Sequence, residues 1–245
     1  MTTTLMCIAV AGLVGYLAGS LSCARIVTWI VSPGSGVAPI VEERDYLDET
    51  YESDTVSATA VRLQLGMKYG CLTGILDMLK VALPTLAFRW WIPDTPYHLV
   101  VAAAGVIGHN WPVYHRFKGG RGESAMFGGL LAIDPLGVVV TNMVGTVFGA
   151  LIGNIIVLRW GGMFLMVPWL AYRTGHWAYV AYMLVVLAAY FVALRPDLAQ
   201  YLKFRKQERA PSQEDIADFL AMGRRLGRFM DRYSLLALLR RRNEV

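Results

Sequence analysis

Residues 136–158 read LGVVVTNMVGTVFGALIGNIIVL and contain no charged side chain. A membrane-spanning helix needs about 20 consecutive apolar residues, so this stretch is long enough to cross a bilayer. The composition of the whole chain agrees, because apolar residues make up 56% of its 245 residues and the mean hydropathy is +0.45. We therefore predict an all-α, polytopic integral membrane helix bundle.

Working outward from this stretch, the apolar pattern predicts about seven membrane segments, within a range of five to seven. Two of them, 123–134 and 161–173, are too short to cross a bilayer alone. The predicted segments cover about residues 5–31, 65–91, 97–113, 123–134, 136–158, 161–173 and 176–194. These segments and their loops form a predicted membrane domain over residues 1–202, which is followed by a basic amphipathic tail over residues 203–245.

The placement of lysine and arginine predicts the orientation. The tail from Lys203 to Arg242 holds eleven of the 23 basic residues and is therefore expected in the cytoplasm. Counting back through seven segments places the N-terminus outside and the loops 32–64 and 114–122 on the cytoplasmic face. The two polar loops are thus expected to meet at a single site.

The pattern of residues 212–242 is typical of an amphipathic helix. Ser212 to Asp215 form a plausible helix start with acidic residues in the first turn. Apolar residues then recur at spacings of three and four, with arginines between them. Such a helix commonly lies on anionic lipid, and docking onto the protein's own loops or onto a partner subunit is the alternative.

The cysteines and the charge exclude several classes of protein. Cys7, Cys23 and Cys71 lie in or beside apolar segments, so we interpret them as small buried hydrophobes. No Cys-x-x-Cys or His-Glu-x-x-His pattern is present, so we predict no zinc and no cofactor. In a membrane protein, a net charge of +5 indicates anionic lipid headgroups or phosphorylated substrates rather than nucleic acid.

A glycine-rich basic loop follows the third predicted segment, where residues 109–122 read HNWPVYHRFKGGRG. Glycine lets backbone N–H groups turn toward a ligand, and the cations add full positive charge, so phosphate is the favoured ligand. A loop that only fixes the topology is the alternative. The candidate phosphate-binding residues of this loop are Lys118, Gly119, Gly120, Arg121 and Gly122.

Asp77 and Lys80 are charged residues inside the predicted segment 65–91, three positions apart and hence on one helical face. Because either charge alone in lipid is costly, both are expected to face the bundle interior or water. A structural ion pair and participation in an anion site are both open interpretations.

Two further groups flank these segments. Ser57, Thr59 and Arg62 cluster at the mouth of segment 65–91, where hydroxyl groups near a helix N-terminus suit phosphate. His109 and Asn110 lead into the glycine-rich loop, and His109 is either a structural hydrogen-bonding residue or an acid–base group. No Ser/His/Asp or Cys/His arrangement is evident, so a covalent intermediate is not indicated.

Two stretches of the chain resemble the signature of a known protein family. Residues 108–112 (GHNWP) and 117–122 (FKGGRG) resemble the signature of the bacterial PlsY family, integral-membrane acyl-phosphate:glycerol-3-phosphate acyltransferases, which reads Gly-His-x-x-Pro and then Phe-Lys-Gly-Gly-Lys-Gly. Residues 77–80 resemble the family's Asp-x-x-Lys, and residues 19–21 its Gly-Ser-Ile. Order and spacing agree over about residues 5–205.

The chain departs from the family at the motif Gly-Ser-Gly-Asn-x-Gly-Ala-Thr-Asn-x-x-Arg. Ser57 and Ala60 stand where the family has Gly and Asn, and Leu63 takes the arginine position with Arg62 one residue early. Residues 34–36 (GSG) are a candidate for the displaced start of the motif. The family's His-x-x-Asn near the end of the last segment is missing.

The resemblance implies transfer of a fatty acyl group from acyl phosphate to the sn-1 hydroxyl of glycerol 3-phosphate, giving lysophosphatidic acid for phospholipid biosynthesis. It implies a multi-pass protein of the bacterial inner membrane whose partners are the two substrates and membrane lipid, with no nucleic acid and no cofactor. The implied catalytic residues are His109, Asn110 and Arg121. The implied substrate-binding residues are Ser57, Thr59, Arg62, Asp77, Lys80, Lys118, Gly119, Gly120 and Gly122.

Two rival functions remain open. A transporter or channel for small phosphorylated anions would explain the buried charges and the cationic loop on physical grounds. It would also predict an internal repeat of membrane segments, and no such repeat is visible in the sequence. A catalytically inactive family member is the other rival, suggested by the altered first motif.

Overall fold

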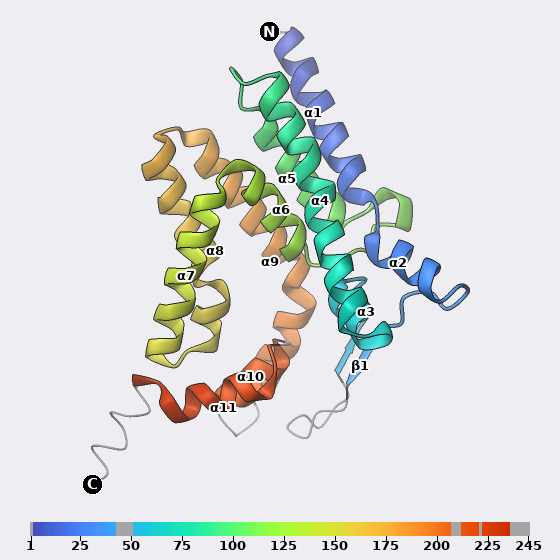
Figure 1. Cartoon of the computed structure of the whole chain (residues 1–245). Coiled ribbons are helices and arrows are strands. Elements are labelled where there is room, and N and C mark those ends of the chain that lie inside the picture. The colour runs from blue at the N-terminus through green and yellow to red at the C-terminus, as the bar shows by residue number, and fades with distance from the viewer. Residues whose placement is uncertain (1, 43–50, 207–211, 221, 236–245) are drawn as a thin grey trace. The chain divides into compact units, whose positions relative to one another are not determined.

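The computed structural model describes residues 2–42, 51–206, 212–220 and 222–235, and most of them are helical (Figure 1). Within these residues, five stretches are long and apolar enough to cross a membrane, and α6 (Glu123–Ile133) is a shorter apolar helix. The five stretches are Thr2–Val31, Met67–Trp91, Pro135–Ile152, Ile155–Thr174 and Trp177–Ala199. The predicted all-α membrane fold is confirmed, whereas the orientation of the termini stays a prediction.

One compact unit contains residues 1–135 and 176–195. Its helices are α1 (Thr2–Ser20), α2 (Cys23–Val31), α3 (Ala58–Leu65), α4 (Met67–Trp91), α5 (Tyr97–Asn110), the 3₁₀ turn η1 (Val113–His115), α6 and the first part of α9 (Trp177–Lys206). Figure 1 shows α1 running beside α5. A Cβ atom on Gly15 or Gly19 would fall on a backbone carbonyl of α5, so these glycines permit the close helix packing that small residues give in membranes.

The first membrane segment is broken, although the sequence predicted one helix over residues 5–31. Helix α1 ends at Ser20 and α2 begins at Cys23. The Lys80 ammonium of α4 donates to the freed carbonyl oxygen of Leu21 at 2.6 Å. Non-helical backbone at membrane depth is tolerated where it lines a cavity, and this break lines the pocket described below.

The polar loop after α2 contains a small antiparallel hairpin that the sequence did not predict. Strand β1 (Ile40–Glu42) pairs with β2 (Tyr51–Ser53), with Val41 opposite Glu52. Three residues beyond β2, the Val56 N–H donates to the carbonyl oxygen of Gly119 at 3.2 Å. The two polar loops therefore meet, as the sequence predicted.

The other compact unit contains residues 136–175 and 196–245. Its membrane helices are α7 (Pro135–Ile152) and α8 (Ile155–Thr174), joined by a turn of two residues. The prediction of one span over 136–158 and a short one over 161–173 is therefore wrong. Gly153 turns the chain with φ +69°, and the Asn154 side chain accepts from two backbone N–H groups of the first turn of α8, at 3.0 and 3.1 Å.

The tail forms two short helices, α10 (Gln213–Phe219) and α11 (Arg224–Tyr233), instead of the single helix predicted over residues 212–242. Ser212 caps α10 in a capping box with Asp215, which confirms the predicted helix start. Residues 236–242 of that prediction lie outside the described part of the chain. The division into domains at residue 202 stays a prediction, and α9 continues through it to Lys206.

Candidate active site

A small pocket lies in the first unit, where the break between α1 and α2, helices α4 and α5 and the glycine-rich loop meet. The pocket is lined by Gly19, Ser20, Leu21, Ser22, Ala24, Val56, Asp77, Lys80, His109, Pro112, Gly119 and Gly120. Several of the residues that the sequence singled out are thus brought together from three distant segments: Asp77, Lys80, His109, Gly119 and Gly120.

The centre of the pocket wall is a buried charge network. Lys80 Nζ lies 2.8 Å from Asp77 Oδ1, 2.9 Å from His109 Nδ1 and 2.6 Å from the Leu21 carbonyl oxygen. The side chains of Lys80 and Asp77 are only 7% and 3% exposed. An ammonium group has three N–H donors, and this one has three acceptors within reach. The ion pair is therefore structural and part of the pocket at the same time.

His109 Nδ1 faces both members of the ion pair, at 2.9 Å from Lys80 Nζ and 3.5 Å from Asp77 Oδ1. A Cβ atom on Gly120 would fall on the other ring nitrogen, Nε2. Glycine at position 120 therefore lets the loop lie directly against the imidazole, a reason that the sequence alone did not give.

Asn110, Arg121 and Gly122 hold the glycine-rich loop in place and do not line the pocket. The Asn110 Nδ2 and Arg121 Nη1 groups donate to backbone carbonyls of α9, at 3.1 and 2.8 Å. Arg121 Nη2 also donates to Ser53 Oγ of β2 at 3.2 Å. Gly122 has φ +85°, and a Cβ atom there would meet Asn110 Oδ1, so the loop packs tightly on Asn110.

The remaining predicted residues lie around the pocket. Ser57 is the N-cap of α3, and its Oγ accepts from the Ala60 N–H at 3.3 Å, which confirms that it stands at a helix N-terminus. Thr59 and Arg62 are half-buried on α3, and Lys118 is exposed. None of these side chains is among the residues that line the pocket.

Arg25 of α2 is a cation at this site that the sequence reasoning missed. Its Nη2 donates to the Lys118 carbonyl oxygen at 3.1 Å, and its Nη1 lies 3.5 Å from Ser22 Oγ. Arg25 is the one charged residue within positions 5–31, and that isolation was a signal that could have identified it. Burial, Arg25 and Lys80 lower the pKa of nearby His115, so this imidazole is neutral at pH 7.

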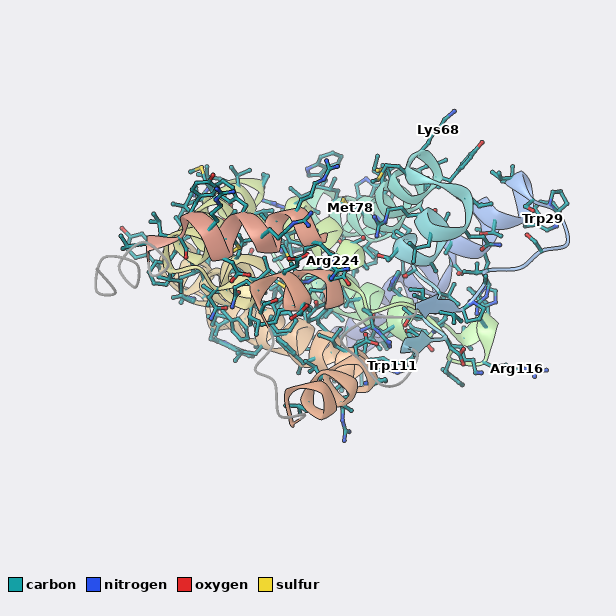
Figure 2. All side chains as sticks on the ribbon, turned by 90° about the horizontal axis from the view of Figure 1, so that it is seen from below. Trp29, Lys68, Met78, Trp111, Arg116 and Arg224 are labelled. Carbon is teal, nitrogen blue, oxygen red and sulfur yellow. The ribbon has the colours of Figure 1, made fainter. Side chains whose placement is uncertain are left out.

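An apolar groove adjoins the pocket and shares Leu21 and Ser22 with it. It is lined by Leu21, Ser22, Arg25, Ile26, Trp29, Tyr114 and His115. Trp29 is 70% exposed, and Figure 2 shows it projecting at the periphery of its unit. A polar, charged pocket thus continues into an apolar groove that opens on a membrane helix.

Comparison with known proteins identifies the family of the chain. A family profile described as glycerol-3-phosphate acyltransferase matches residues 7–203. Proteins named glycerol-3-phosphate acyltransferase are 32% identical over 134 residues in Myxococcus xanthus, covering 54% of this chain and 63% of that protein. In Klebsiella pneumoniae the identity is 36% over 137 residues, covering 55% of this chain and 58% of that protein. The chain therefore spans somewhat more than half the length of these curated relatives.

Two solved structures share the fold. They are crystal structures of PlsY (YgiH), an integral membrane glycerol 3-phosphate acyltransferase, in a lysophosphatidic acid form and a glycerol 3-phosphate form. Both match with a TM-score of 0.64 and 22% identity, covering 81% and 85% of this chain and 93% and 98% of the solved chains. Because the family profile matches most of the chain, this protein belongs to the glycerol-3-phosphate acyltransferase family.

Proposed function

We propose that this protein transfers a fatty acyl group from acyl phosphate to the sn-1 hydroxyl of glycerol 3-phosphate, releasing lysophosphatidic acid and inorganic phosphate. The observation that carries the proposal is the buried Asp77–Lys80–His109 network in a pocket that continues into an apolar groove. Both substrates bear phosphate and one bears an alkyl chain, so the reaction needs such a junction. The names of the relatives support the acceptor, and the cations Arg25 and Lys118 beside the pocket support a phosphate-bearing donor.

We assign the phosphate contacts to the Gly119 N–H group and to the cations Arg25 and Lys118 at the pocket mouth, and the buried charge of Lys80 adds to the attraction. Charge-assisted hydrogen bonds to phosphate are about twice as strong as neutral ones, and backbone N–H groups add fixed partial charge. The site is expected on the cytoplasmic face of the bacterial inner membrane, where glycerol 3-phosphate is soluble and the alkyl chain can enter from lipid.

Other predicted residues take different roles in this proposal. Arg121 and Asn110 act as positioning residues, because both hold the glycine-rich loop against α9. Arg62, Ser57 and Thr59 of the neighbouring α3 segment stay candidates for the second phosphate, because Ser57 follows directly on the lining residue Val56.

The proposed chemistry needs no covalent enzyme intermediate, since acyl phosphate is already activated. The acceptor hydroxyl oxygen bonds to the acyl carbonyl carbon, the carbonyl carbon–phosphate oxygen bond breaks, and the hydroxyl proton moves to the departing phosphate. Positioning and electrostatic stabilisation then supply the rate enhancement. His109 donates a hydrogen bond from its ring to the oxygen on which negative charge develops.

The apolar groove gives the alkyl chain its place. Leu21, Ile26, Trp29 and Tyr114 are lining residues of the groove. Each methylene group that is removed from water contributes about 0.8 kcal/mol. A chain lying there brings its carbonyl end to Leu21 and Ser22, where groove and pocket join.

The direct test is an acyl-transfer assay on the purified protein in lipid nanodiscs with radiolabelled glycerol 3-phosphate. Palmitoyl phosphate is expected to give labelled lysophosphatidic acid and one phosphate per product, while palmitoyl-CoA at equal concentration gives none. If palmitoyl-CoA gave product and palmitoyl phosphate gave none, the proposed acyl donor would be wrong. No product from either donor would contradict the enzyme, and uptake of label by sealed proteoliposomes would then favour the transporter.

A further inference from the structure

The tail helices α10 and α11 lie at one end of the membrane helices of their own unit. Helices α7 and α8 are both long enough to span a bilayer and are joined by only Gly153 and Asn154, so this turn lies at a membrane surface. Figure 1 shows α10 and α11 crossing this end of α7 and α8. The tail hairpin is thus held at the level of lipid headgroups.

The inner face of the hairpin is fixed to the first turns of α8. The Gln213 side-chain oxygen accepts from the Ile155 N–H at 2.8 Å, and Arg159 donates to the Leu220 carbonyl oxygen at 2.5 Å. Around these bonds, Ile155, Ile216, Ala217 and Met230 form a buried apolar cluster. The apolar face of the hairpin therefore docks onto the protein itself, on helix α8, whereas the sequence offered the protein's own loops or a partner subunit as the alternative to lipid.

The outer face of α11 carries cations and aromatic rings. Positions 225, 228, 229 and 232 recur at spacings of three and four and so share one side of the helix, opposite the buried Gly227 and Met230. Phe229 and Tyr233 are 57% and 55% exposed, with ring centroids 5.1 Å apart. This outer face consists of Arg225, Arg228, Phe229, Arg232 and Tyr233.

The acidic residues of the hairpin are engaged in its own contacts. Glu214 accepts from Arg224 at 3.1 Å and lies 3.7 Å from Arg228, Asp231 accepts from the Glu214 N–H at 3.3 Å, and Asp215 caps α10. Arg225, Arg228 and Arg232 outnumber the one carboxylate of α11, so the outer face is positive. In Figure 2, seen from below, α11 and the labelled Arg224 lie in front of α7 and α8.

We propose that the outer face of α11 binds anionic phospholipid headgroups of the membrane leaflet at the α7–α8 turn. Arginine donates to lipid phosphate through a planar fork, and aromatic rings favour the boundary between headgroups and acyl chains. This surface adds to the fold shared with the family, because the family profile ends at residue 203. It does not depend on the proposed acyl transfer.

The test compares the full-length protein in nanodiscs of phosphatidylcholine alone with nanodiscs that also contain phosphatidylglycerol. Amide hydrogen exchange of residues 224–235 is measured by mass spectrometry. Each surface cation is worth about fivefold in attraction to an anionic membrane, so exchange is expected to slow at least about tenfold with phosphatidylglycerol and to recover in high salt. Exchange that is the same in both lipids would overturn the proposal.

Three variants separate lipid binding from a structural effect. The triple variant Arg225→Gln/Arg228→Gln/Arg232→Gln is expected to lose the difference between lipids, and the triple Arg→Lys variant at the same positions to keep it. Arg224→Gln removes one charge beside Glu214 and is expected to keep it. Unchanged exchange of α10 in phosphatidylcholine verifies the docking, and a lipid difference that persists in the Gln variant would contradict the proposal.

Discussion

At the scale of single residues, the feature with the largest energetic cost is a lysine and an aspartate that are buried together within a membrane helix. Asp77 and Lys80 are nearly inaccessible and pair at 2.8 Å. Removing one partner of a buried pair costs about 3–5 kcal/mol, because the other charge is left uncompensated, whereas replacing both can be neutral. The pair therefore allows its structural role and its role in the pocket to be measured separately.

We predict that Lys80→Met lowers both stability and acyl transfer, the free energy of unfolding by about 3–5 kcal/mol. The double variant Asp77→Asn/Lys80→Met is expected to recover most of the stability, because no unpaired charge remains, but none of the activity. Denaturation curves and turnover of the same preparations measure the two quantities. Recovery of activity in the double variant would show that the pair is structural only.

We predict that Gly120→Ala lowers kcat by about a hundredfold without unfolding the protein, because its methyl group displaces the His109 ring, and misplacement by about 1 Å can cost that much. Gly74→Ala is the matched control. Its Cβ atom would lie an ordinary 3.8 Å from Ala58 and Ser124. Full turnover by folded Gly120→Ala protein would refute the role of this close approach.

At the scale of elements, Arg121 connects the glycine-rich loop to both the β-hairpin and α9. Its two terminal nitrogens donate to different elements, Ser53 of β2 and Ala193 of α9. A lysine keeps the charge but presents a single ammonium group without the planar fork. The sequence predicted this residue as a direct phosphate ligand, and its observed contacts indicate a positioning role.

We predict that Arg121→Ala lowers kcat strongly and that Arg121→Lys gives an intermediate loss, while Ser53→Ala, which removes one acceptor, costs about 1 kcal/mol or less. Steady-state kinetics of the three variants give kcat and KM separately. If Arg121→Ala raised KM for glycerol 3-phosphate and left kcat unchanged, Arg121 would be a phosphate ligand instead.

The helix ends show which elements a sequence can predict. The turn at Gly153–Asn154 had a local signal, because glycine followed by a capping residue stands inside the apolar stretch. The prediction nevertheless ran one span through it, because the residues on both sides are apolar. At the break between α1 and α2, the Leu21 carbonyl oxygen accepts from Lys80, 59 positions away. Long-range hydrogen bonds of this kind leave no periodicity in the chain.

At the scale of the whole molecule, membrane class and the pairing of the two polar loops could be predicted, because composition and charge placement determine them. The β-hairpin and the split tail could not, because three-residue strands have no usable period and the tail's helical spacing runs through the bend between α10 and α11. The pocket was only partly predictable. Its residues were found individually, but the apolar groove beside it depends on how α2 packs.

We predict from the charge distribution that the loop containing Arg116 faces the cytoplasm. Arg116 is exposed, and Figure 2 shows it at the periphery of its unit. In a protein whose Cys7, Cys23 and Cys71 are replaced by alanine, Arg116→Cys is expected to react with an impermeant maleimide only after the cells are opened. Efficient labelling of intact cells would show that this loop faces the outside and that the predicted topology is wrong.

The proposed function requires the Asp77–Lys80–His109 pocket to bind the phosphate of the substrate. Equilibrium binding of radiolabelled glycerol 3-phosphate to purified protein in nanodiscs tests it most directly, because no acyl donor is needed. Lys68 on the same helix is exposed and points away from its unit in Figure 2, so Lys68→Met is the matched control. We predict wild-type affinity for Lys68→Met and a loss of about tenfold to a hundredfold for Asp77→Asn/Lys80→Met. Wild-type affinity in the folded double variant would show that this pocket does not bind the phosphate.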